Sequence, residues 1–122
     1  SLIDDITAYL KTAINSACSG GIKPDKIIID PGLGFGKTKE DNLEIMRHLP
    51  DFKVLGKPIL IGPSRKSFIG KVLGADVKER CAGSLALSVI AACNGANILR
   101  VHDVKETNQS LKIVTAIKNA NA

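Results

Sequence analysis

Three short apolar runs alternate with helical patterns along the 122 residues of this chain. The runs lie at 27–29, 58–62 and 97–101, and helical patterns precede, separate and follow them. An α-β-α-β-α-β-α order of this kind favours parallel strands joined by right-handed crossover helices. The sequence therefore predicts an α/β fold of parallel β/α units, organised as a single domain over residues 1–122.

The first two helices have recognisable faces and ends. Between Leu2 and Ala17 apolar residues recur at helical spacing, and a glycine pair follows. A second helix is expected to begin after Thr38, because Asp41 stands three residues later, as in a capping box.

The last two helices differ in character. The segment 84–93 is apolar nearly all round, so we expect a helix buried on most sides and ended by Gly95. Asp103 is expected to cap the final helix. The buried stripe predicted for that helix is Leu111, Val114 and Ile117.

The stretch 26–38, KIIIDPGLGFGKT, has the strongest local signal of a site. Its three isoleucines predict a strand buried on both faces, as in parallel sheets. Asp30 follows the strand and precedes a glycine-rich loop that would let a ligand approach the backbone. The alternative is that Asp30 only closes a turn of its own loop. Nucleotide P-loop and dinucleotide motifs fail, because Pro31 and Lys37 stand where glycines are required.

Net charge and composition limit the classes of molecule that the protein is expected to bind. A net charge of +5 favours anionic ligands, whereas 3% aromatics and the lack of a Lys/Arg run argue against nucleic acid. Phosphorylated or carboxylated small molecules fit better. Three widely spaced cysteines predict neither zinc nor disulfides, and indicate reduced thiols in the cytoplasm. No apolar stretch is long enough to predict a membrane span.

Polar residues follow each predicted strand. They are Asp30, the loop from Ser64 to Ser67, Arg100 and His102. Active sites of parallel α/β folds gather at this edge, so we expect one shared site. Arg100, His102 and Lys66 would form a cationic patch suited to phosphate or pyrophosphate. The alternatives are a solvated loop at 64–67 and a structural role for His102.

Three blocks of the sequence resemble dihydropteroate synthase in order and spacing. They are DPGLGFGK at 30–37, IGPSRKSFIG at 61–70 and GSLALSVIAACNGANILRVHDVKET at 83–107. The resemblance implies a (β/α)8 TIM barrel that joins 6-hydroxymethyl-7,8-dihydropterin pyrophosphate to p-aminobenzoate in folate synthesis. It also implies Mg2+ as a cofactor and a homo-oligomer.

The resemblance also implies roles for individual residues. Asp30 matches the carboxylate that binds the pterin amino and ring N–H groups. Lys66 matches a lysine that reaches the pterin, and Arg100 matches an arginine lying against it. These three are the implied catalytic residues, and His102 matches a pyrophosphate contact.

Further substrate contacts follow from the same match. Phe35 and Ser67 match residues at the p-aminobenzoate end of the site, with the ring packing on Phe35 and the carboxylate near Ser67. Lys66 helps to form this pocket, and Gly62 belongs to the substrate-binding set.

The chain is short for this family. A (β/α)8 barrel needs about 250 residues, and the resemblance predicts the C-terminal part of one, from the helix before strand six to strand eight. The asparagine that helps hold Mg2+ in the family is absent from this chain, so no metal ligand is assigned here. We therefore expect an incomplete barrel, a partial domain with little or no synthase activity alone.

Two alternatives remain open. The chain could be a non-catalytic module that self-assembles through the helix at 83–94 and exposed barrel edges. It could also belong to a related pterin-binding methyltransferase, although the SRKS and RVHDV blocks favour the synthase.

Overall fold

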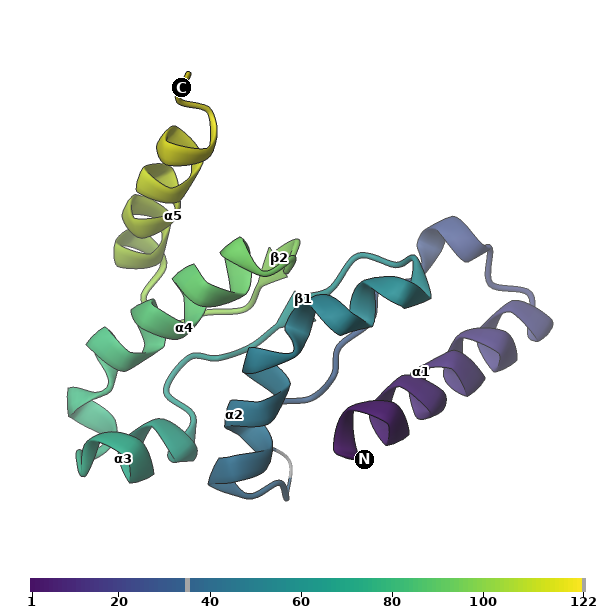
Figure 1. Ribbon diagram of the computed structural model, residues 1–122, viewed down its shortest axis with the longest axis horizontal. Coiled ribbons are helices and arrows are strands. Elements are labelled where there is room, and N and C mark those ends of the chain that lie inside the picture. Colours follow the sequence, from purple (N-terminus) through teal and green to yellow (C-terminus); the bar gives the residue numbers. More distant parts are fainter. Residues whose placement is uncertain (35, 122) are drawn as a thin grey trace.

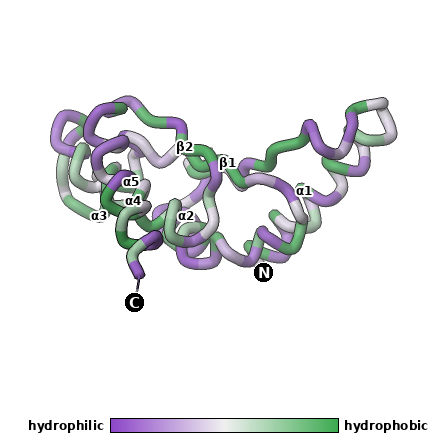
Figure 2. The backbone as a smooth tube through the Cα atoms, turned by 90° about the horizontal axis from the view of Figure 1, so that it is seen from above, coloured by the Kyte–Doolittle hydropathy of each residue, from purple (hydrophilic) through white to green (hydrophobic). Residues whose placement is uncertain are grey.

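The computed structural model describes residues 1–34 and 36–121, and shows helices alternating with short extended segments (Figure 1). The elements in order are α1 (Leu2–Ser19), η1 (Pro24–Lys26), α2 (Lys39–Arg47), η2 (Leu49–Leu55), β1 (Leu60–Ile61), α3 (Ser67–Leu73), η3 (Val77–Glu79), α4 (Cys81–Cys93), β2 (Ile98–Leu99) and α5 (Val104–Lys118). The helices lie along one face of the central strands, with α1 at one end of the molecule and α3 to α5 at the other (Figure 2).

The extended segments run parallel, as predicted. β1 pairs with β2, with Leu60 opposite Ile98 and Ile61 opposite Leu99. A parallel bridge joins Ile29 to Ile59 on the other side. The three predicted runs therefore lie side by side, with the run that contains β1 in the middle.

The run 27–29 is not the fully buried strand that the sequence predicts. Ile29 is 3% exposed, but Ile28 is 51% exposed. Successive residues of an extended chain point to opposite faces, and no element of the described chain covers the face on which Ile28 lies. The prediction of burial on both faces is therefore wrong for this run.

The first two helices form where the sequence predicts them. α1 buries Ile3 and Leu10 on its predicted stripe. Thr38 Oγ1 accepts a hydrogen bond from the Asp41 N–H at 3.0 Å, and Asp41 Oδ2 accepts from the Thr38 N–H at 3.1 Å. This reciprocal capping box satisfies two backbone donors at the start of α2.

The hydrophobic core lies between α1, α2, η2 and the strands. Its most deeply buried side chains are Ile45, Leu49, Phe52, Ile59, Ile61 and Ala91, each at 1% exposure or less. The core is aliphatic apart from Phe52 and Phe68, as the low aromatic content implies. It holds β1 firmly against the helices and so fixes the loop that follows β1.

Two predictions about the last helices are wrong. α4 buries only Ser84, Ser88 and Ala91, and Ile90 is 46% exposed. On α5 only Thr107 is buried; of the predicted stripe, Leu111 and Val114 are half-buried and Ile117 is 70% exposed. The reason is that α4 packs on α5 (Figure 1) and on α2 and α3 over only part of its surface, while α5 packs mainly on α4.

The predicted cap of α5 is also wrong. Asp103 stands at the cap position, but its side chain accepts no bond from the helix N-terminus. Its carboxylate pairs with Arg65 instead. No helix in the described part of the chain is long and apolar enough to cross a membrane.

Candidate active site

A cleft of about 560 Å³ opens at the carboxyl ends of the three parallel segments. Its lining residues come from all three strand ends: Asp30, Leu33, Leu60, Gly62, Ser64, Lys66, Arg100, Val101 and His102. Five of the seven residues to which the resemblance gives a role in the site therefore line one cavity. Of the other two, Ser67 begins α3 and does not line the cleft. Phe35 lies outside the described residues.

Asp30 closes a turn and also lines the cleft. Its Oδ1 accepts a hydrogen bond from the Gly32 N–H at 2.8 Å, and Gly32 has a positive φ of 80°. The alternative of a loop-closing aspartate therefore describes part of its role. Because Asp30 is exposed and faces the cleft as well, closing the turn does not remove its carboxylate from the site.

The glycine loop is held by a buried amide that the sequence analysis missed. Asn42 is 2% exposed, and its Oδ1 accepts a hydrogen bond from the Gly34 N–H at 2.7 Å. Its Nδ2 donates to the Thr38 carbonyl at 2.8 Å. The sequence could have indicated this contact, because Asn42 lies on the apolar face of α2 and a buried amide needs hydrogen-bond partners.

Gly34 lies beside the side chain of Lys66. A Cβ at Gly34 would lie 3.6 Å from Lys66 Cδ and 3.9 Å from Nζ. The Lys66 side chain therefore runs beside the glycine loop. Gly34 also has φ of 84°, a left-handed conformation that glycine adopts without strain.

Pairing of β1 with β2 brings Gly62 against Arg100. The Arg100 N–H donates to the Ile61 carbonyl at 2.9 Å. A Cβ at Gly62 would lie 3.8 Å from Arg100 Cβ. The register of the sheet therefore sets where Arg100 enters the cleft.

Ser64 ties His102 to the loop after β1. Ser64 is 7% exposed, and its Oγ accepts a hydrogen bond from the His102 N–H at 3.2 Å. The same oxygen lies 2.9 Å from His102 Nδ1. Both the backbone and the ring of His102 are oriented by this serine, so the histidine has the structural role considered from the sequence while lining the cleft.

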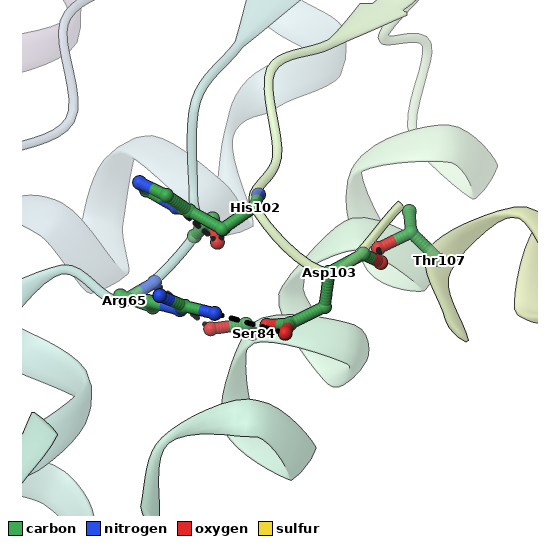
Figure 3. A network of polar contacts seen from close by, with 6 residues as sticks. Arg65, Ser84, His102, Asp103 and Thr107 are labelled. Carbon is green, nitrogen blue, oxygen red and sulfur yellow. Dashed lines mark hydrogen bonds and ion pairs between the residues drawn. The ribbon is translucent and has the colours of Figure 1, made fainter. Parts of the chain in front are cut away.

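The loop at 64–67 is not the solvated loop that was the alternative from the sequence. The Arg65 N–H donates to Ser84 Oγ at 2.9 Å, and Arg80 Nη1 donates to the Arg65 carbonyl at 3.3 Å. Arg65 Nη2 lies 3.0 Å from Asp103 Oδ1 (Figure 3). Ser84 and Arg80 were missed because their role depends on a contact across the fold, which no local pattern shows.

The side chains that line the cleft could bind an anionic group together with a ligand ring that carries N–H donors. Lys66, Arg100 and His102 supply nitrogen donors, and Asp30 supplies the carboxylate among its lining residues. No group of three His, Cys, Asp or Glu side chains that could hold a metal ion occurs within residues 1–34 and 36–121. The described residues therefore do not fit a magnesium site of their own.

A sequence model of the pterin binding enzymes matches residues 1–102. The chain belongs to the pterin binding enzyme family. The match covers the whole cleft as far as His102.

Individual members of the pterin binding enzyme family agree with this assignment. The chain is 48% identical over 118 residues to dihydropteroate synthase of Clostridium beijerinckii, covering 96% of this chain and 44% of that protein. It is 45% identical over 117 residues to dihydropteroate synthase of Synechocystis sp., covering 95% of this chain and 40% of that protein.

Solved structures of pterin binding enzymes share the fold. Dihydropteroate synthase of Xanthomonas albilineans in complex with 7,8-dihydropteroate has a TM-score of 0.96 at 39% identity. The match covers 98% of this chain and 46% of that structure. The same enzyme with 4-aminobenzoic acid matches with the same TM-score and identity, over 98% of this chain and 44% of that one.

The comparisons confirm the resemblance and the fold class drawn from the sequence. The chain forms part of a TIM barrel, with parallel β/α units. It spans less than half the length of the relatives it matches.

Proposed function

We propose that this chain carries the pterin pyrophosphate site of a dihydropteroate synthase. The proposed reaction condenses 6-hydroxymethyl-7,8-dihydropterin pyrophosphate with p-aminobenzoate and releases pyrophosphate. The observation that carries the proposal is the convergence of Asp30, Lys66, Arg100 and His102 on one cleft. Relatives solved with 7,8-dihydropteroate and with 4-aminobenzoic acid support these substrates.

Each group has a chemical part in this proposal. The carboxylate of Asp30 accepts hydrogen bonds from the pterin amino and ring N–H groups, which orients the ring. Lys66, Arg100 and His102 surround the pyrophosphate. Arginine offers planar paired donors, and lysine offers a compact charge.

The reaction proceeds by departure of pyrophosphate. The bond between the pterin methylene carbon and the pyrophosphate oxygen breaks, and its electron pair leaves with the oxygen. The amino nitrogen of p-aminobenzoate then attacks the methylene carbon, forms the new C–N bond and loses a proton. The cationic side chains stabilise the charge that develops on the leaving group.

The p-aminobenzoate end of the proposed site is less complete in this chain. We assign it to Lys66, Ser67 and Phe35, with Gly62 at the pterin end. Mg2+, as expected for the family, would supply further positive charge beside the leaving group. Its protein ligand is expected from a part of the barrel outside this chain, and no step proposed here depends on it.

Calorimetric titration of the chain with 6-hydroxymethyl-7,8-dihydropterin pyrophosphate tests the proposal. We expect saturable binding that weakens at least tenfold in Asp30→Ala and in Lys66→Ala, about 1.4 kcal/mol or more each. Matched controls are Asp25→Ala and Lys71→Ala, which remove the same charges at exposed positions away from the cleft. These controls should bind as the unaltered chain does.

Turnover requires the rest of a barrel. A chimera in which this chain replaces the matching segment of the Clostridium beijerinckii relative should form dihydropteroate, and Lys66→Ala in the chimera should abolish product. If the folded chain binds no pterin pyrophosphate and the chimera is inactive, the proposal fails.

A second candidate is self-association, favoured by the uncovered faces of α4 and α5. Ile90, Ile113 and Ile117 are each 46% exposed or more. Sedimentation equilibrium of the chain at two concentrations tests this candidate, and a monomer at both would exclude it. Self-association without pterin binding would favour the non-catalytic module instead.

A further inference from the structure

Arg65 has a backbone conformation shared by no other non-glycine residue in the described chain. Its φ is +55°, in the left-handed region. An arginine in this region is disfavoured by contact between its Cβ and the backbone, and such residues persist where surrounding contacts hold them. The contacts around Arg65 therefore need an explanation.

Arg65 is held by two segments, the start of α4 and the loop after β2. Its N–H donates to Ser84 on α4, and its carbonyl accepts from Arg80, just before α4. Its guanidinium reaches Asp103 in the loop after β2, with 3.0 Å between Nη2 and Oδ1. Figure 3 shows the two side chains pointing toward one another across the two loops.

Because Asp103 pairs with Arg65, its side chain does not cap α5. The residue occupies the cap position of α5, where an aspartate ordinarily accepts a backbone N–H. Instead α5 begins without a side-chain cap. The carboxylate is turned to Arg65, and its Oδ2 is buried without a hydrogen-bond partner among the described residues.

Arg65 and Asp103 each stand beside a residue of the cleft. Ser64 and Lys66 flank Arg65, and His102 precedes Asp103. Ser64 and His102 bond to each other, and Arg65 and Asp103 bond to each other, so two consecutive residues of one loop pair with two of the other. Neither Arg65 nor Asp103 lines the cleft. Both line a separate pocket with Val77, Lys78 and Cys81.

We propose that the Arg65–Asp103 ion pair is a positioning contact that holds Lys66 and His102 in register across the pterin pyrophosphate cleft. Because neither residue lines the cleft, neither is assigned a contact with the substrate. An ion pair with one partner 45% exposed contributes little to folding stability. We therefore expect its main effect to be on the relative position of the two loops. The inference rests on the proposed function, because it assigns these residues to the same site.

The first test needs no ligand. The His102 N–H is bonded to Ser64, not to Arg65 or Asp103, so its hydrogen-exchange protection reports the register of the two loops. We expect Asp103→Ala to lower this protection about tenfold, while the Arg100 N–H, bonded to Ile61 in the sheet, keeps its protection. Unchanged protection at His102 would overturn the inference.

The second test measures affinity for the pterin pyrophosphate. Asp103→Ala and Arg65→Gly should each weaken binding about tenfold, and the double variant should be no weaker than either, since both remove one contact. Glycine keeps the left-handed conformation, so Arg65→Gly tests the side chain alone. Glu106→Ala is the control, because it removes a nearby exposed negative charge.

Asp103→Asn guards against a folding defect. It keeps the volume and the Oδ1 acceptor, so its effect should be smaller than that of Asp103→Ala, with an unchanged circular dichroism spectrum. Full affinity in the Arg65 and Asp103 variants would overturn the inference while leaving the proposed function intact. If the unaltered folded chain fails to bind and the chimera is also inactive, the proposed function fails, and the positioning role fails with it.

Discussion

Residues up to about 70 and those that follow are packed very differently. Every buried apolar residue of the described core except Ala91 lies before residue 70. The later part instead places Val104, Ile113 and Ile117 at more than 60% exposure on α5. The earlier part therefore supplies nearly all of the hydrophobic core, whereas the later part adds only Ala91 and the half-buried side chains that pack on the core from α4 and β2.

The cleft spans the boundary between these two regions. Asp30, Gly62 and Lys66 come from the well-packed region, and Arg100 and His102 come from the other. Close packing holds a side chain in place, but little packing fixes the second group. The pairing of β2 with β1 and the polar contacts between the loops hold it instead. The difference shows that the part of the site beyond the hydrophobic core is held in place by hydrogen bonds and an ion pair, and not by close packing.

The largest effect should come from the core of the first region. Phe52 is fully buried in η2, so Phe52→Ala should lower the free energy of unfolding by about 3–5 kcal/mol through lost burial and a cavity. Urea denaturation followed by circular dichroism measures it. A loss below about 1 kcal/mol would show that the first region does not carry the stability of the chain.

An intermediate effect should come from the contact between α3 and α4, which joins the two regions. A Cβ at Gly83 would lie 2.5 Å from Ile69 Cγ2, so Gly83→Ala should overpack this contact and cost about 1–3 kcal/mol in the same measurement. Gly20→Ala is the matched control. There φ is −81° and the nearest atom to a Cβ would be the Ser16 carbonyl oxygen at 3.4 Å, so the change should stay within about 0.5 kcal/mol.

An equal cost for the two glycine substitutions would contradict close packing between α3 and α4. It would indicate that the later helices move independently of the core. The two regions would then differ in packing and would also unfold separately from each other.

The smallest effect should come from the outer face of α5. Ile117 is 70% exposed, so Ile117→Ala should change the free energy of unfolding by less than about 0.5 kcal/mol. If the chain self-associates through this face, the same substitution should raise its dissociation constant in sedimentation equilibrium. A large loss of stability in monomeric protein would show that the face is covered within the chain.

Much of the site was predictable because its signals are local. Three apolar runs separated by helical patterns predicted parallel segments, and polar residues after each run predicted a shared edge. Asp30, Lys66, Arg100 and His102 were found in this way. The resemblance to dihydropteroate synthase then supplied their expected ligands, which spacing alone could not.

The sequence by itself determined the elements with short-range causes. The stripe of α1 and the box of Thr38 and Asp41 need only residues within one or two helical turns. Gly32 and Gly34 adopt positive φ, as expected for a loop rich in glycine, because glycine has no Cβ to disfavour that conformation. Each of these features depends on neighbours along the chain, so pattern is sufficient to predict it.

The tertiary structure decided everything that depends on which distant segments meet. Asp103 could have capped α5, but Arg65, 38 residues earlier, lies within reach and takes its carboxylate. The apolar side chains of Ile28 and Ile117 fit a buried pattern, yet no described segment covers them. Burial and ion pairing are contacts between surfaces, and local propensity does not say which surfaces the fold brings together.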